Sequence, residues 1–285
     1  MKGVIWIMLS MAISSPASKA HTWQVSDKPL PKTKTNVIGM QFEKIPAGSM
    51  IAGRLVLQCP EPPDDRRVPV EERWTEEDYQ RCQTLAARDS RPGFRVAIDR
   101  DFYIGKFEVT QSQWQQVMGV NPAFFQRENI GEDTGNYPVE NVTWEDVQVF
   151  ISRLNKLDGT ATYRLPTEFE WEYAARAGAE SPLSWQETRL QAWIQDSDQG
   201  STRAVGEMKP NAWGLYDMLG NVWEWVADFH NGKTLPDSRP PKRGLVHVLK
   251  GGSFTSDVVN ATWYFHGGGP GNGFDVGFRL VMEPI

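Results

Sequence analysis

The chain of 285 residues contains only two cysteines and four histidines. Cys59 and Cys82 show no CxxC spacing and have no histidine close by in the sequence, and the histidines are not spaced as a metal-binding triad. This scarcity argues against a zinc site and against a reactive thiol pair.

Long basic runs and internal apolar runs are also missing. Lys and Arg number 30 against 36 Asp and Glu, which gives a net charge of −6 at pH 7. No basic run is long enough to follow a phosphate backbone, so we expect no nucleic-acid partner. Beyond residue 20, no segment is apolar enough to cross a bilayer, so we expect no stable membrane anchor.

The one pronounced apolar run lies at the N-terminus. Lys2 precedes GVIWIMLSMAI, and small residues follow up to Ala20, in the order typical of a secretory signal peptide. The run is about half of the roughly 20 residues that span a bilayer, which favours cleavage after Ala20 over an N-terminal membrane anchor. We therefore expect residues 1–20 to be a signal peptide and the mature chain to be secreted, in the periplasm.

Export changes the expectation for the two cysteines. Under oxidising conditions the simplest prediction is a single disulfide between Cys59 and Cys82 that closes a loop, with a reactive or metal-binding pair as the alternative.

The remaining chain divides into an arm and one domain. Residues 21–38 are polar and proline-containing, which predicts an extended N-terminal arm, and the domain is expected to cover 39–285. The segments MQFEKIPAGSM and FRVAIDRDFYIGKFEVT read as strands that pair. Between them lies a charged insertion at about 54–93, in which Thr75 is placed to cap a short helix that carries Cys82.

Two further helices have clear start and stop signals. Thr143 precedes WEDVQVFISRLNKLDG and Thr167 precedes EFEWEYAARAG, each with an acidic residue at the third helical position and a glycine at the end. After Gly178 the chain is rich in loops. The pattern predicts an irregular α+β domain with little regular secondary structure, not a barrel or a doubly wound sheet. Twelve Trp residues supply a core, since each buried ring removes about 150–250 Å² from water.

Five motifs together carry a resemblance to a known family. They are YPVENVTWEDVQVFISRLN, YRLPTEFEWEYAARAG, KPNAWGLYDMLGNVWEWVAD, KGGSF and VGFRLV. Their order and spacing resemble the formylglycine-generating enzyme family, also called the sulfatase-modifying-factor family, over about residues 40–283. The resemblance implies a fold related to C-type lectins with bound calcium. In the parent enzymes it implies copper-dependent oxidation of a cysteine to formylglycine in nascent sulfatases.

The chain departs from the family where the chemistry takes place. The parent enzymes bind copper with two cysteines after the GGS turn, and these positions hold Ser256 and Ala261 here. A hydroxyl and a methyl cannot replace two thiolates, so no copper and no parent activity are expected, and no catalytic residue is assigned.

The resemblance also implies a peptide-binding groove around the two positions. Residues of this chain that map to it are Ser256, Trp263, Tyr264, Phe265, His266 and Asp275. Three of them are aromatic, which suits a binding surface. The alternative is that these rings simply fill the core of an irregular fold.

The family's calcium motif, in contrast, is retained in YDMLGNVWEW. The resemblance implies ligation by the side chains of Asp217 and Glu224 and by the carbonyls of Gly220 and Val222. A hard cation prefers such oxygen ligands. The alternative is that Asp217 caps the turn and Glu224 is solvated.

These observations favour an exported pseudoenzyme that binds a protein or peptide partner. The alternatives are an enzyme of altered chemistry in the same family, such as the oxidative maturation of a peptide or siderophore-like substrate, and an unusual oxidase of the parent type. Bound redox metal would favour an enzyme, and calcium alone a binding protein.

Overall fold

The computed structural model describes residues 33–55, 75–197, 200–258, 260–269 and 271–285. The predicted signal peptide, most of the N-terminal arm and Cys59 lie outside these ranges, so cleavage after Ala20 and the disulfide with Cys82 stay predictions. None of the helices in these ranges is both long enough and apolar enough to cross a lipid bilayer.

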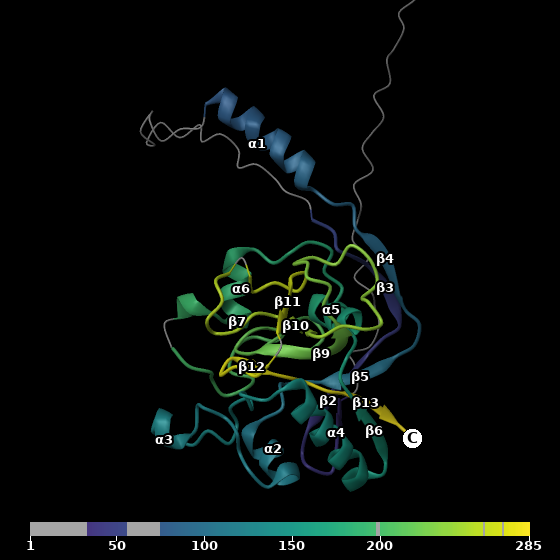
Figure 1. Cartoon of the computed structure of the whole chain (residues 1–285), viewed down its shortest axis with the longest axis vertical. Helices are drawn as coiled ribbons and strands as arrows, with labels where there is room; N and C mark the ends of the chain where they lie inside the picture. Colours follow the sequence, from purple (N-terminus) through teal and green to yellow (C-terminus); the bar gives the residue numbers. More distant parts are fainter. Residues whose placement is uncertain (1–32, 56–74, 198–199, 259, 270) are drawn as a thin grey trace, which may run out of the picture. The chain divides into compact units, whose positions relative to one another are not determined.

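The largest sheet has five antiparallel strands that come from the N-terminal part, the middle and the C-terminal end of the chain. They are β1 (Thr33–Thr35), β2 (Gln41–Ile45), β5 (Phe102–Gly105), β13 (Val281–Pro284) and β6 (Ala161–Arg164), in this spatial order. The C-terminal strand β13 thus lies between β5 and β6 (Figure 1). The predicted arm contributes the edge strand β1, which pairs with β2.

A second sheet carries the strands around the candidate site. Its spatial order is β11 (His266–Gly269), β10 (His247–Lys250), β9 (Trp223–Phe229) and β12 (Val276–Gly277). The first three strands are antiparallel, whereas β12 runs parallel to β9. The strands β7 (Ala192–Trp193) and β8 (Leu219–Gly220) form a short parallel pair.

The insertion predicted at about 54–93 lies between two paired strands. β3 (Gly48–Ala52) pairs antiparallel with β4 (Phe94–Ile98), and a bridge between Leu55 and Arg91 extends this pairing. With the β2–β5 pairing, this confirms that the two predicted strand segments pair. The helix predicted after Thr75 is α1 (Glu76–Asp89), and its capping box with Asp78 is formed.

Both of the other predicted helices are confirmed. α4 (Trp144–Asp158) starts at the capping box of Thr143 and ends at Gly159, which adopts a positive φ of 64°. α5 (Glu168–Arg176) starts at Thr167, but the residue that leaves the helix is Ala177, with φ 46°, one residue before the predicted stop.

Three helices appear that the sequence analysis did not predict. They are α2 (Gln111–Met118), α3 (Arg127–Ile130) and α6 (Trp185–Gln191). A short 3₁₀ turn, η2, spans Gln195–Ser197. α2 and α6 each begin with a capping box, formed by Thr110 with Gln113 and by Ser184 with Glu187.

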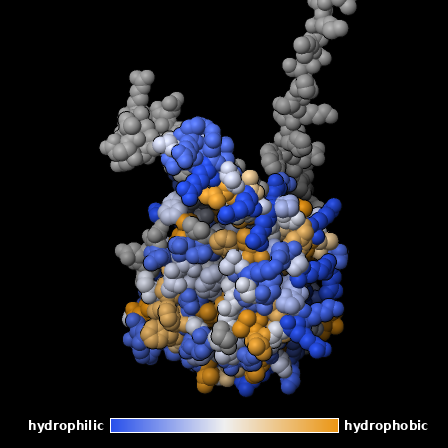
Figure 2. Space-filling view, turned by 45° about the horizontal axis from the view of Figure 1, so that its top comes forward, coloured by the Kyte–Doolittle hydropathy of each residue, from blue (hydrophilic) through white to orange (hydrophobic). Residues whose placement is uncertain are grey.

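Two apolar clusters fill the described domain. One joins α5 to the β3–β4 pair and contains Trp171 and Trp263. The other joins α2 and α4 to the five-stranded sheet and contains Trp114, Phe150 and Phe278. On the face drawn in Figure 2, apolar residues form small patches among hydrophilic ones. The mixture of helices and mainly antiparallel strands confirms the predicted α+β class.

Candidate functional site

A glycine turn after β10 brings the two family cysteine positions together. Gly251 and Gly252 adopt positive φ angles of 94° and 80°, a region that favours glycine. A Cβ atom added to Gly252 would lie 3.3 Å from Ser256 Oγ and 3.3 Å from Ala261 Cβ. Ser256 and Ala261 therefore lie against the same glycine, as a shared site requires.

The replacements at these positions serve the structure of the turn. Ser256 is 8% exposed, and its Oγ accepts a hydrogen bond of 3.0 Å from the backbone N–H of Ser253. Ala261 is 1% exposed and packs in the apolar cluster that contains Trp263. A hydroxyl held in this way and a methyl group do not offer the soft ligands that monovalent copper prefers.

An open apolar pocket lies beside Ala261. Its volume is about 220 Å³, and α6 supplies Trp185, which is 46% exposed. The lining residues are Pro182, Leu183, Trp185, Thr188, Leu219, Val258, Ala261, Thr262, Trp263 and Tyr264. Since this lining contains no charged side chain, the pocket suits an uncharged apolar group.

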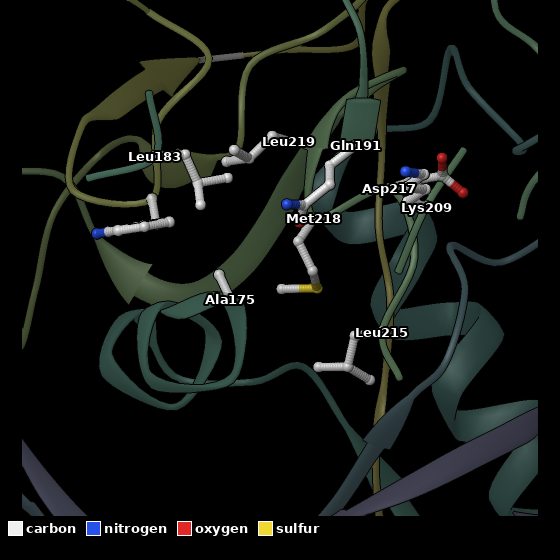
Figure 3. Close-up of a pocket in the computed structure, with 9 residues that line it drawn as sticks. Ala175, Leu183, Gln191, Lys209, Leu215, Asp217, Met218 and Leu219 are labelled. Carbon is white, nitrogen blue, oxygen red and sulfur yellow. The ribbon is translucent and has the colours of Figure 1, made fainter. Parts of the chain in front are cut away.

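A second cavity lies next to the first and is much smaller. Its volume is about 10 Å³, room for about one water molecule. Figure 3 shows its lining, which is mainly apolar around Met218 and also includes the polar side chains of Gln191, Lys209 and Asp217. Leu183, Leu219 and Trp263 line both cavities. The smaller cavity is too small for a ligand and is a packing feature that adjoins the larger pocket.

The three predicted groove aromatics occupy different environments. Trp263 is 3% exposed and belongs to the core cluster, so the alternative that it fills the core holds for this ring. Tyr264 is half-buried and lines the larger pocket. Phe265 is half-buried against the ring of Tyr264, with ring centroids 4.9 Å apart. Of the three, Tyr264 therefore has both exposure and a place in the pocket wall.

His266 was predicted to line the groove, but it lies in a buried ion network. It is 5% exposed, and its Nδ1 lies 2.6 Å from Glu168 Oε1. Lys250 Nζ lies 3.7 Å from the same oxygen and 3.4 Å from Glu172 Oε2. Burial by itself would raise the pKa of Glu168, but the hydrogen bond from His266 and the charge of Lys250 hold it below its ordinary value. His266 is therefore placed as a structural residue.

Asp275 does not line the pocket and is instead bonded to the segment that follows the glycine turn. Its Oδ2 accepts hydrogen bonds from Ser253 Oγ at 2.9 Å and from Thr255 Oγ1 at 3.1 Å. Its side chain is partly exposed, and Thr255 is exposed. These bonds fix the carboxylate next to the segment that leads to Ser256, and its place in a groove wall stays a prediction.

The predicted calcium ligands lie in a buried cluster of three carboxylates and one guanidinium. Asp217 is 2% exposed, and its Oδ2 accepts a hydrogen bond of 2.7 Å from Gly206 N–H. Its Oδ1 has no hydrogen-bond partner among the described residues. Burial raises the pKa of Asp217 to about 6. An unpaired buried carboxylate oxygen is the feature expected of a cation ligand.

Glu224 is more fully satisfied than Asp217. Its two oxygens accept hydrogen bonds from Arg279 at 2.6–2.9 Å, and Oε2 also accepts one of 2.7 Å from Trp171 Nε1. Glu108 is the third carboxylate, and it accepts from Asn221 Nδ2 and from the N–H of Val222. Burial, with the charges of Asp217 and Glu224, raises the pKa of Glu108 well above its ordinary value.

The cluster fits a divalent cation in charge and only partly in geometry. Three carboxylates face one guanidinium, so the balance when all are ionised is two negative charges, which one Ca²⁺ would neutralise. Asp217 offers a free oxygen, whereas Glu224 would have to share its oxygens with Arg279. In the part of the chain that the structure describes, no three His, Cys, Asp or Glu side chains are grouped as metal ligands, so backbone carbonyls such as those of Gly220 and Val222 would have to complete the set.

The family of the chain follows from its sequence. Residues 66–284 match the sulfatase-modifying factor enzyme 1-like domain. The chain belongs to the sulfatase-modifying factor family. By the resemblance of its motifs, the positions of the two parent cysteines correspond to Ser256 and Ala261 in this member.

Relatives of this family member include a chaperone and an enzyme. Chaperone protein LppX of Paenibacillus barcinonensis is 31% identical, over 64% of this chain and 80% of the relative. The formylglycine-generating enzyme of Thermomonospora curvata is 36% identical, over 54% of this chain and 58% of the enzyme. The solved structure of Treponema denticola variable protein 1 is 26% identical, with a TM-score of 0.61 over 90% of this chain and all of that one. These likenesses confirm an α+β domain of the formylglycine-generating enzyme type.

Sequence reasoning missed several residues of the site. Glu108 and Arg279 complete the carboxylate cluster, and Trp185 supplies the exposed wall of the pocket. Arg279 lies within the VGFRLV motif, which the sequence analysis used only as part of the family resemblance. An arginine in an otherwise apolar segment near the C-terminus is a signal for a buried ion pair, because an unpaired buried charge would be costly.

Proposed function

We propose that this family member is an exported, non-catalytic binding protein that holds a protein or peptide partner at the surface around Gly252. The observation that carries the proposal is the pair of substitutions at that turn. Ser256 uses its hydroxyl to hold the backbone of Ser253, and Ala261 presents a methyl group beside an apolar pocket. The name of the relative from Paenibacillus barcinonensis, a chaperone, supports a protein partner.

An enzyme of altered chemistry is the second possibility that the family allows. It would need an activated group near the turn. The carboxylate of Asp275 accepts hydrogen bonds from Ser253 and Thr255, while Ser256 Oγ is engaged with a backbone N–H. This pairing favours binding over nucleophilic catalysis, because the carboxylate is not placed to take a proton from Ser256.

The protein should not form formylglycine. Incubated with copper, oxygen and a sulfatase-type cysteine peptide, it is expected to leave the cysteine unchanged, since two thiolates are required to hold the metal. Mass spectrometry of the peptide measures the outcome. The formylglycine-generating enzyme of Thermomonospora curvata under the same conditions serves as the positive control. Aldehyde produced by this chain would refute the proposal.

The pocket beside Ala261 should anchor the partner through Trp185. Peptides selected from a phage-displayed random library on the wild-type protein should bind the Trp185→Ala variant about tenfold or more weakly, as expected for an aromatic hot spot. Leu190→Ala is a matched control, because Leu190 is 49% exposed on the same helix and does not line the pocket. Equal losses in the two variants, or none in either, would remove the pocket from the proposed site.

We also propose that calcium binds the carboxylate cluster as a structural ion. The unpaired Oδ1 of Asp217 and the excess of negative charge support it. An ion that binds only the folded state stabilises that state by mass action. Its role would be to hold the loop between β8 and β9, which carries Asn221 and contacts the turn at Phe254.

If calcium binds, the order of the melting temperatures of the wild type and Asp217→Asn should depend on whether calcium is present. In excess calcium, the wild type should melt at a higher temperature than Asp217→Asn, which loses a ligand. After chelation the order should reverse, because asparagine can keep the hydrogen bond from Gly206 and removes an uncompensated buried charge. Differential scanning calorimetry measures both, with the exposed Glu128→Gln as the control. A wild-type melt that is indifferent to chelation would contradict the site.

A further inference from the structure

Four phenylalanine rings from three separate segments form a cluster beside the turn. They are Phe124 and Phe125, between α2 and α3, Phe254, after β10, and Phe274, before β12. Ring centroids of the contacting pairs lie 5.1–6.3 Å apart, within the range of favourable aromatic contacts. Phe254 is two residues before Ser256, so the cluster borders the proposed partner-binding surface.

The cluster has a buried base and an exposed top. Phe125 and Phe254 are 7% and 6% exposed, which is ordinary for core rings. Phe124 and Phe274 are 55% and 50% exposed, although they are in contact with each other and with the buried pair. Large apolar rings that remain half-exposed on a supporting base are typical of binding surfaces.

Two carboxylates accompany these rings. Glu140 is fully buried, and its Oε1 accepts a hydrogen bond of 2.8 Å from Phe125 N–H. Its Oε2 has no hydrogen-bond partner within the described ranges. Asp275 follows Phe274 directly, and the hydroxyls of Ser253 and Thr255 hold its carboxylate in place.

The two carboxylates have no counter-ion among the described residues. Neither takes part in an ion pair there, and Asp275 adds its negative charge to the burial that raises the pKa of Glu140 to about 7. A buried carboxylate oxygen without a partner is unusual, because desolvation of the charge is not repaid. The exposed part of this surface therefore combines aromatic rings with the carboxylate of Asp275.

We infer that Phe124, Phe274 and Asp275 form a binding site for an organic cation, the guanidinium or ammonium group of an arginine or lysine side chain of a protein partner. The faces of aromatic rings attract such cations, and Asp275 supplies a charged hydrogen-bond acceptor. Glu140 accepts a hydrogen bond from the N–H of Phe125, which packs against both exposed rings, so it helps to hold the base of the site. This site rests on the proposed function, because it assigns a cationic side chain to the part of the partner that would lie next to the Gly252 turn.

Titration with small probes tests the cation site directly. Nα-acetylarginine amide should shift the aromatic resonances of Phe124 and Phe274 in the NMR spectrum of the protein. Nα-acetyllysine amide, whose side-chain ammonium group is free, should do the same. N-acetylcitrulline amide, which has nearly the shape of arginine without its charge, should bind at least about fivefold more weakly. Equal binding of the arginine and citrulline probes would overturn the inference.

Two variants separate the contributions of charge and rings. Asp275→Asn, which can still accept the hydrogen bonds from Ser253 and Thr255, should reduce the preference for arginine over citrulline about fivefold or more. Phe274→Leu keeps an apolar side chain at this position but removes the ring, and should weaken the arginine probe without altering the citrulline probe. Val120→Ala, at another exposed apolar residue, is the control. Thermal melts establish that each variant is folded, and unchanged discrimination in both would refute the site.

The source of the cation and the proposed function are tested separately. A short peptide that contains arginine should bind more tightly than the arginine amide if the site recognises a side chain of a protein. Equal affinities would overturn the assignment to a protein partner. If library peptides still depend on Trp185 while arginine and citrulline probes behave alike, the proposed function stands and this inference fails. If arginine binds selectively but no peptide depends on Trp185, the pocket is excluded and the cation site stands.

Discussion

Replacement of Arg279 by methionine should destabilise the protein by about 3–5 kcal/mol, the range expected when one partner of a buried ion pair is removed. The guanidinium is fully buried. It donates three hydrogen bonds to Glu224, one to Gly105 O and two to the carbonyls of Tyr216 and Asp217. Without this guanidinium, the neighbouring buried carboxylates of Glu224, Glu108 and Asp217 would have no positively charged side chain in the cluster to offset their repulsion.

Urea unfolding, followed by tryptophan fluorescence, measures this loss. Arg153→Met is the control, because Arg153 is exposed and its replacement should change the free energy of unfolding by less than about 0.5 kcal/mol. The double variant Arg279→Met with Glu224→Gln should recover part of the loss, since it removes the negative charge that the arginine balanced. A loss below about 1 kcal/mol, or a double variant less stable than Arg279→Met, would contradict this account of the cluster.

Local signals in the sequence were sufficient for the helix starts that were predicted. A capping box needs only a hydroxyl residue and an acidic or amide residue three positions later, so Thr75, Thr143 and Thr167 reveal their helices without knowledge of the fold. The same signal at Thr110 and Ser184 was overlooked, because Thr110 follows a β-rich segment and Ser184 starts a helix of only seven residues.

Strand pairing depends on contacts that a local pattern does not contain. The β3–β4 pair could be predicted because its strands flank one insertion. The position of β13 between β5 and β6 could not, because the three strands lie far apart in the sequence. Their order is fixed by the packing of the whole core, including Tyr163 and Met282.

The candidate site was predictable only where the family's motifs extend. Motif spacing located Ser256 and Ala261, and the structure places both against Gly252. It also assigned His266 to the groove, whereas a bond to Glu168 holds this residue in the buried network. The phenylalanine cluster comes from three distant segments, and no single stretch of the sequence contains its pattern of exposure.

Replacement of Lys250 by methionine should be the second strongly destabilising change, with a loss of about 3 kcal/mol, the lower end of the range for a broken buried pair. Lys250 is fully buried between Glu168 and Glu172, and its Nζ lies 5.8 Å from the centroid of the Trp171 ring. The loss should be smaller than that of Arg279→Met, because each glutamate keeps a second partner. Glu172 remains paired with Arg176, and Glu168 remains bonded to His266.

The pH dependence of stability provides an independent readout of the same change. The pKa of Glu168 is below its ordinary value of 4.5 in the folded protein, so its contribution to stability is present above pH 4.5 and is lost as the pH falls through the folded pKa. Without Lys250 this pKa should rise towards 4.5, so the part of the acid-induced loss of stability that comes from Glu168 should be smaller than in the wild type and should be complete at a higher pH.

Urea unfolding at a series of pH values tests both parts of this prediction, with Lys156→Met on the exposed side of α4 as the control. The double variant Lys250→Met with Glu168→Gln should regain stability at neutral pH, because glutamine can still accept a hydrogen bond from His266 Nδ1 and carries no charge that needs Lys250. A Lys250→Met protein as stable as the wild type would show that burial of this ion network costs as much as its pairing returns. A double variant less stable than Lys250→Met would show that Glu168 is held by His266 alone.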